Sequence, residues 1–293
     1  MSRQAEAWEQ RGHRIPFGDG ELFVVDVELG DAVHDPVLIL HGFPTSSFDW
    51  HLVVEDLAQD RRVVLFDFPG FGLSWKPDRR YSIELYADAA EAVAEQCGFE
   101  SATLVTHDMG DTVGGELLAR DMERGLGFVV TGRVLTNGSV YIELAQLTPG
   151  QEMLLAADDA VLDLAGIGLD PEEAFRAGLA ATFSEAHPAG DDELDAAWRF
   201  ASHADGHMLL ARTIRYIEDR RANESRYTGA IETHLSPLGV VWGRLDPVAV
   251  YDMATRLVER RPATPLVTLG DVAHWPMLEA PDELSSVIRG FLD

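Results

Sequence analysis

Residues 105–111 read Val105-Thr106-His107-Asp108-Met109-Gly110-Asp111, and this stretch decides the fold. The apolar run Ala102 to Val105 predicts a buried strand, and Thr112 to Arg120 predicts a helix. Between them, small residues stand two positions on either side of Asp108. This is the spacing of a strained strand–turn–helix elbow that raises one side chain at the end of a sheet. Here that side chain is a carboxylate.

Asp108 is the candidate nucleophile. Its carboxylate would lie beside the positive end of a helix dipole, so we expect it to be ionised and exposed. An ionised, exposed carboxylate suits covalent catalysis. A carboxylate opens esters poorly, but it can displace a strained or good leaving group from a saturated carbon. The product would be an ester on Asp108 that water must then cleave. The alternative is an ordinary aspartate that caps a helix.

Length and composition set the class of protein. The 293 residues are 46% apolar, which favours one large α/β domain with an insertion over two equal domains. Cys97 is the only cysteine, so the sequence predicts no internal disulfide and no cysteine metal site. We expect no metal and no cofactor. The first residues lack the apolar core of a signal peptide, and no apolar run approaches the roughly 18–20 residues of a membrane span, so a soluble cytoplasmic protein is expected.

The net charge of −27 constrains the partners. Such a protein repels phosphates, so a nucleic-acid partner is not expected and anionic substrates are disfavoured. We expect a neutral, mostly apolar small molecule as substrate, together with water. Two origins of the acidity stay open, a GC-rich genome and adaptation to high salt. Whether the chain forms a homodimer also stays open.

Strand-like and helical segments alternate, which predicts an α/β fold with a mostly parallel central sheet and helices on both faces. The predicted strands are 21–27, 37–40, 63–66, 102–105, 133–136, 238–242 and 266–269, and the predicted helices are 82–97, 112–120, 249–260 and 282–292. Between residues 141 and 234 the sequence is helical and carries little strand signal. We therefore predict a first core part at 1–138, an inserted helical cap at 139–235 and a second core part at 236–293.

Three further loops follow predicted strands, where open α/β sheets build their sites. His41-Gly42-Phe43-Pro44 can present the Phe43 N–H to a developing oxyanion, together with the N–H of Met109. Asp246 follows one strand and His274 follows the last. The order nucleophile, acid, histidine suits His274 as the base that activates water and Asp246 as the group that orients its ring.

These motifs, with the run Asp67-Phe-Pro-Gly-Phe-Gly-Leu-Ser74, resemble the α/β-hydrolase superfamily. Within it, the aspartate elbow is similar to the branch of epoxide hydrolases and haloalkane dehalogenases, and most narrowly to the mesoderm-specific transcript group with its bacterial relatives. The resemblance implies Asp108 as nucleophile, His274 as base and Asp246 as acid partner. It also implies Phe43 and Met109 as the oxyanion hole. The expected substrate contacts in the same loops are His41, Pro44, His107 and Trp275.

Epoxide hydrolases use cap tyrosines to protonate the epoxide oxygen, so the resemblance implies Tyr216 and, second, Tyr141 as donors. A phenol, with an ordinary pKa of about 10, stays protonated at neutral pH. A packing role for Tyr216 is the alternative. The sequence thus predicts a cofactor-independent epoxide hydrolase. A haloalkane dehalogenase is the rival, although Met109 cannot hold a halide as an indole N–H would. A non-catalytic binding protein on the same scaffold is the second rival.

Overall fold

The computed structural model describes residues 3–157 and 161–292, and within them one central sheet organises the chain. Its strand order is β1-β2-β4-β3-β5-β6-β7-β8. Strands β3 to β8 are parallel, while β2 runs antiparallel to β1 and β4, which confirms the mostly parallel sheet. The strands are β1 (His13–Phe17), β2 (Gly20–Val27), β3 (Val37–Leu40), β4 (Val63–Phe66), β5 (Ser101–His107), β6 (Val129–Thr136), β7 (Leu238–Gly243) and β8 (Leu266–Leu269).

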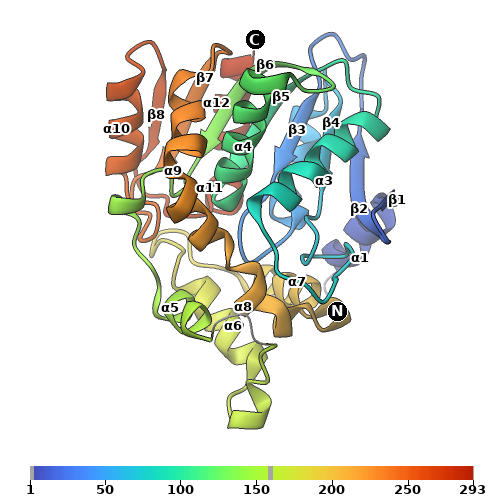
Figure 1. Ribbon diagram of the computed structural model, residues 1–293, viewed down its shortest axis with the longest axis vertical. Coiled ribbons are helices and arrows are strands. Elements are labelled where there is room, and N and C mark those ends of the chain that lie inside the picture. Colours follow the sequence, from blue (N-terminus) through green and yellow to red (C-terminus); the bar gives the residue numbers. More distant parts are fainter. Residues whose placement is uncertain (1–2, 158–160, 293) are drawn as a thin grey trace.

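Helices cover both faces of this sheet (Figure 1). Those outside the segment between β6 and β7 are α1 (Arg3–Arg11), α2 (Val54–Leu57), α3 (Ile83–Gln96), α4 (Met109–Arg124), α10 (Asp252–Arg260), α11 (Pro276–Glu279) and α12 (Pro281–Leu292). In β3, Leu38 and Leu40 pack into one hydrophobic cluster, whereas Val37 and Ile39 pack into the other. Successive strand residues point to opposite faces, so a strand buried on both faces must be apolar throughout.

Between β6 and β7 the described chain is helical. It contains α5 (Pro149–Ala156), α6 (Pro171–Ala180), α7 (Asp191–Ser202), α8 (Leu210–Thr213) and α9 (Tyr216–Thr233), with short 3-10 turns η2 (Ile142–Leu144), η3 (Ala165–Ile167) and η4 (His203–Leu209). Figure 1 shows α5, α6 and α8 gathered beyond one end of the sheet, while α9 leads back from them along α4. The segment predicted as a cap is therefore helical where the structure describes it, and the cap boundaries at 139 and 235 remain a prediction.

The sequence prediction missed α1, β1, α2 and α11 and misplaced the starts of three elements. Helix α1 and strand β1 were not predicted; Pro16 interrupts the strand pattern of β1, and proline is tolerated there because β1 is an edge strand. The helix expected from residue 112 begins at Met109, and the strand expected from residue 133 begins at Val129. The helix expected from residue 249 begins at Asp252. No helix in residues 3–157 and 161–292 is long and apolar enough to cross a membrane.

Gly115 allows α4 and α9 to pack closely. A Cβ built on Gly115 would lie 2.8 Å from the carbonyl oxygen of Tyr227 and 3.2 Å from its Cα. These are backbone atoms of α9, which cannot rotate away as a flexible side chain would. Helix α9 begins at Tyr216, so this packing also restrains the helix that carries Tyr216.

We predict that Gly115→Ala lowers the free energy of unfolding by about 1–3 kcal/mol, because the added methyl group overpacks the α4–α9 contact. Gly229→Ala is the matched control in α9, since a Cβ there meets nothing within 4 Å. It should raise stability by about 0.5–1 kcal/mol, because alanine loses less backbone entropy in a helix. Urea denaturation measures both changes, and an equal effect of the two substitutions would contradict the packing argument.

Candidate active site

Asp108 occupies a strained turn between β5 and α4. Its backbone has φ 49° and ψ −114°, a conformation that residues other than glycine rarely adopt. Gly110 permits the turn, because a Cβ there would lie 2.3 Å from the carbonyl oxygen of Leu40. The geometry of the predicted elbow is therefore present. The expectation of an exposed carboxylate is wrong, since Asp108 is only 2% exposed.

The loop after β3 holds the Asp108 carboxylate. The backbone N–H of Phe43 donates a hydrogen bond of 2.8 Å to Asp108 Oδ2. Strands β3 and β5 are parallel neighbours in the sheet, so their carboxyl ends bring this loop and the elbow together. Met109, the first residue of α4, is fully buried beside them. An N–H already aimed at one carboxylate oxygen can stabilise negative charge on that oxygen.

His274 and Asp246 form a buried pair beside the elbow. His274 Nδ1 lies 2.8 Å from Asp246 Oδ2, and both side chains are at most 4% exposed. A carboxylate can only accept here, so Nδ1 carries the proton and Nε2 is the nitrogen left for chemistry. The two residues predicted as base and acid partner are thus brought together.

Asn137 fixes the orientation of Asp246, and sequence reasoning missed it. Its Nδ2 donates to Asp246 Oδ2 at 2.7 Å, while Asp246 Oδ1 accepts from the N–H groups of Val248 and Ala249 at 2.7 and 2.9 Å. Asn137 directly follows β6, as Asp246 closely follows β7, and these strands are neighbours. This position at the carboxyl edge of the sheet was the signal that could have revealed it.

Glu279 fixes the loop that carries His274, and it too was missed. Its carboxylate accepts from the backbone N–H groups of Ala273 and Trp275, both at 2.9 Å, and of Ser184 at 3.0 Å. The last contact ties this loop to the segment between α6 and α7. Glu279 lies in α11, a short helix without a motif, so no sequence signal pointed to it.

The environment makes His274 unusually basic. Burial by itself would lower the pKa of its imidazole, but the charge and hydrogen bond of Asp246, with the charges of Asp108 and Glu279, raise the pKa to about 9. Imidazolium is therefore favoured at neutral pH, chiefly because of Asp246.

Tyr216, the predicted proton donor, lies beside Phe43. The two ring centroids are 5.7 Å apart, and Tyr216 is 1% exposed. The Arg220 guanidinium stands over the tyrosine ring at 5.2 Å from its centroid. Burial and then the charge of Asp108 raise the pKa of Tyr216, whereas Arg220 lowers it. The net increase keeps the phenol protonated, as a donor requires.

Tyr141, the second predicted donor, is not brought to the site. Its hydroxyl donates to Glu232 Oε1 at 2.8 Å, and Arg256 stacks on its ring. The chain between β6 and α5 thus directs this side chain toward α9 and α10 rather than toward Asp108. The prediction that Tyr141 donates a proton beside Asp108 is therefore wrong.

Two predicted substrate contacts serve the scaffold instead. His41 has both ring nitrogens engaged, because Nδ1 donates to the carbonyl of Gly42 at 2.8 Å and Nε2 accepts from Phe68 N–H at 3.0 Å. His107 donates from Nε2 to the carbonyl of His274 at 2.8 Å and so supports the loop that carries His274. Burial lowers the pKa of both histidines, which keeps them neutral. Neither residue lines the cavity described next.

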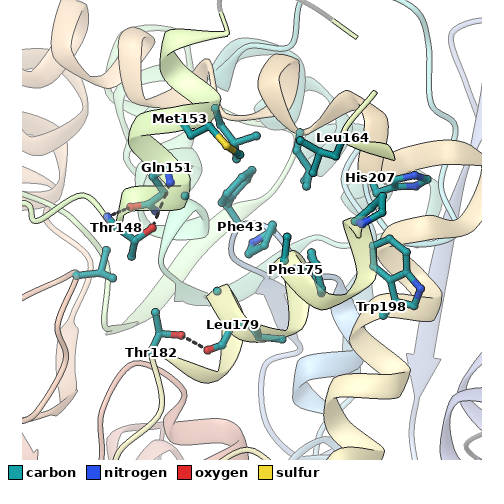
Figure 2. A pocket seen from close by; sticks show the side chains of 18 of the residues that line it. Phe43, Thr148, Gln151, Met153, Leu164, Phe175, Leu179, Thr182, Trp198 and His207 are labelled. Carbon is teal, nitrogen blue, oxygen red and sulfur yellow. Dashed lines mark hydrogen bonds between the residues drawn. The ribbon is translucent and has the colours of Figure 1, made fainter. Parts of the chain in front are cut away.

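A mostly apolar cavity reaches this group of residues from the helical segment (Figure 2). Its empty volume is about 840 Å³, counted with the part that opens to solvent. His274 and Trp275 form its inner wall with Phe43 and Pro44, so the predicted contacts Pro44 and Trp275 are brought to it. Asp108 and Tyr216 lie behind Phe43 rather than in the cavity wall. In the described part of the chain, no group of His, Cys, Asp and Glu could hold a metal ion.

Several known proteins are similar in sequence to this chain over nearly its whole length. LipZ of Mycobacterium tuberculosis, which is named as a hydrolase, is 36% identical over 281 residues, covering 96% of this chain and 95% of LipZ. The human mesoderm-specific transcript homolog protein is 30% identical over 300 residues, covering 100% of this chain and 89% of that protein. Epoxide hydrolase 1 of Caenorhabditis elegans is 23% identical, covering 98% of this chain and 71% of that enzyme.

These similarities agree with the resemblance inferred from the motifs. The sequence model of the alpha/beta hydrolase fold family matches residues 35–281, which include the elbow, Asp246 and His274. The match also spans the helical segment between β6 and β7. The chain therefore belongs to the alpha/beta hydrolase fold family and is a hydrolase of that family.

Proposed function

We propose that the protein is an epoxide hydrolase that works through a covalent ester on Asp108. The observation that carries the proposal is the position of the Asp108 carboxylate, on a strained turn, bonded to Phe43 N–H and next to the His274–Asp246 pair. A carboxylate in the place of the usual serine favours attack on a saturated carbon over attack on an ester. The similarity to Epoxide hydrolase 1 supports the same direction.

In the first step Asp108 Oδ1 attacks a ring carbon of the epoxide. The carbon–oxygen bond of the ring breaks, and Tyr216 gives its phenolic proton to the oxygen that leaves. The attacking carboxylate must be negatively charged, and the raised pKa of Tyr216 keeps its proton available until the ring opens. The substrate must pass Phe43 to reach Asp108, so a shift of the Phe43 side chain belongs to this step.

In the second step water cleaves the ester. His274 Nε2 takes one proton from water, and the hydroxide attacks the carbonyl carbon of Asp108. The oxyanion forms on Oδ2, where Phe43 N–H and Met109 N–H stabilise it. When the ester bond breaks, His274 protonates the departing alkoxide and the diol leaves. The second proton of the water, left on the Asp108 carboxyl group, restores the Tyr216 phenol.

The basicity of His274 fits this order of events. With Asp108 charged, a pKa of about 9 favours imidazolium, which cannot act as a base. Ester formation removes the negative charge of Asp108 and with it one cause of the raised pKa. The pKa of His274 is therefore lower in the ester than in the free enzyme, although the charge of Asp246 remains. The proton that His274 loses passes to the solvent and returns when Asp108 regains its charge.

We predict that His274→Gln traps the covalent intermediate. Alkylation of Asp108 should proceed, while hydrolysis of the ester stalls for want of a base, so mass spectrometry should find a substrate-sized adduct on the peptide that contains Asp108. Asp108→Asn is the control and should carry no adduct. Absence of an adduct with every epoxide and haloalkane offered would remove Asp108 as the nucleophile.

We predict that Tyr216→Phe slows ester formation from epoxides by roughly 10²–10⁴-fold, the usual contribution of a positioned general acid. The rate is measured in single turnovers in the His274→Gln background. Tyr141→Phe is the matched control, and the rate should stay near that of the parent, since Glu232 already accepts from that hydroxyl. If haloalkanes alkylate Asp108 and epoxides do not, the protein is a dehalogenase instead.

A further prediction concerns the pKa of His274. In Asp108→Asn, which mimics the loss of charge in the ester, the pKa of His274 should lie below its value in the wild-type protein, because a nearby negative charge favours imidazolium. Titration of the imidazole by NMR measures it, with His234, paired with Asp121 away from the site, as the internal reference. An equal or higher pKa for His274 would contradict the release of the base on alkylation.

A further inference from the structure

Few polar side chains face the cavity. Most of its wall is aliphatic or aromatic, and the polar residues are Thr148, Gln151, Thr182, Trp198, His207 and His274. Thr182 is engaged, because its hydroxyl donates to the carbonyl of Leu179 at 2.6 Å and accepts from Trp275 Nε1 at 2.7 Å. His274 belongs to the catalytic pair. A polar group that stays free in such a cavity selects the substrate.

Gln151 is held in one orientation by the start of α5. Its side-chain Oε1 accepts from the backbone N–H of Thr148 at 2.9 Å, and the backbone N–H of Gln151 donates to Thr148 Oγ1 at 3.2 Å. Figure 2 shows the two residues facing each other on one side of the cavity, opposite Trp198 and His207. This reciprocal pair is a capping box, which satisfies helix N–H groups that otherwise lack partners.

The capping box also fixes which atom of the amide is free. A backbone N–H can only donate, so the oxygen of the Gln151 amide must face Thr148 and Nε2 must face away. In the described part of the chain Nε2 has no hydrogen-bond acceptor, and it is not a fully buried atom. Its two N–H groups are therefore donors held ready at the wall of an apolar cavity.

We propose that Gln151 Nε2 donates a hydrogen bond to an oxygen of the substrate, so that the enzyme prefers apolar epoxides with an ether or carbonyl oxygen apart from the ring. This rests on the proposed epoxide hydrolysis. A purely apolar substrate would strip water from Nε2 and leave the donor without a partner, which lowers affinity. A substrate with a suitably placed oxygen replaces that water.

The test uses a series of 1,2-epoxyalkanes in which an ether oxygen replaces one methylene at a time along the chain. Gln151→Glu is the informative variant, because a carboxylate keeps the oxygen that the capping box needs and removes the Nε2 donors. At the best ether position, the ratio of kcat/KM for the ether to kcat/KM for the all-carbon epoxide should fall about tenfold from wild type to Gln151→Glu. Comparing ratios cancels the different hydrophobicity of the two compounds.

Gln146→Glu is the matched control, since it makes the same change at an exposed glutamine of the preceding loop that does not line the cavity. It should leave the ratio unchanged. The proposal is overturned if the ratio is the same in Gln151→Glu as in the wild type at every ether position. It is also overturned if Gln151→Glu lowers turnover of the ether and the all-carbon epoxide equally.

A second readout separates this inference from the proposed reaction. The same ether and all-carbon compounds are titrated into Asp108→Asn, with and without Gln151→Glu, and their dissociation constants are measured by calorimetry. The Gln151-dependent preference for the ether should appear in these constants without turnover. If the preference for the ether appears in binding while the wild type opens no epoxide, the proposed epoxide hydrolysis is wrong and the proposed hydrogen bond from Gln151 is upheld. If the wild type opens epoxides but shows no such preference, the proposed hydrogen bond from Gln151 is wrong.

Discussion

The hydrogen bond from Phe43 N–H to Asp108 Oδ2 joins the two loops on which the site depends. One loop follows β3 and the other follows β5, so the bond exists only when these strands lie side by side in register. It restrains the carboxylate on a strained turn and leaves Oδ1 as the oxygen that would attack in the proposed reaction. It also places a donor on the oxygen where charge would develop during ester hydrolysis.

Around this bond, two buried carboxylates, those of Asp246 and Glu279, have their oxygens bonded by N–H donors. Asp246 accepts from His274, Asn137 and two backbone N–H groups, so both of its carboxylate oxygens have donors. Glu279 likewise accepts from the backbone of the loop that carries His274. Charges at these depths persist only when fully hydrogen-bonded, and such bonding holds the imidazole in place. The helical segment adds the apolar cavity and, in the Gln151 amide, a donor held in a fixed orientation.

Sequence reasoning succeeded where a signal is local. The runs 37–40 and 63–66 became strands with those bounds, because uninterrupted apolar stretches have few alternatives in a doubly covered sheet. The run 266–269 also became a strand with its predicted bounds, at the edge of the sheet. It failed for Tyr141, which bonds Glu232, and for His41, whose ring is occupied by backbone groups. A residue's type and spacing do not state which partner lies nearest after folding.

The sequence by itself determined the parallel sheet, the elbow with an aspartate at its tip and the order Asp108, Asp246, His274, because each depends on residues adjacent in the chain or on strand ends that must meet at one edge. Only the tertiary structure decided that Asp108 is buried, that Asn137 bonds Asp246 while Glu279 bonds the loop of His274, and that Gln151 rather than Tyr141 faces the cavity. These facts depend on packing between segments far apart in sequence, where the position of one helix, such as α9 against α4, sets the surroundings of many side chains.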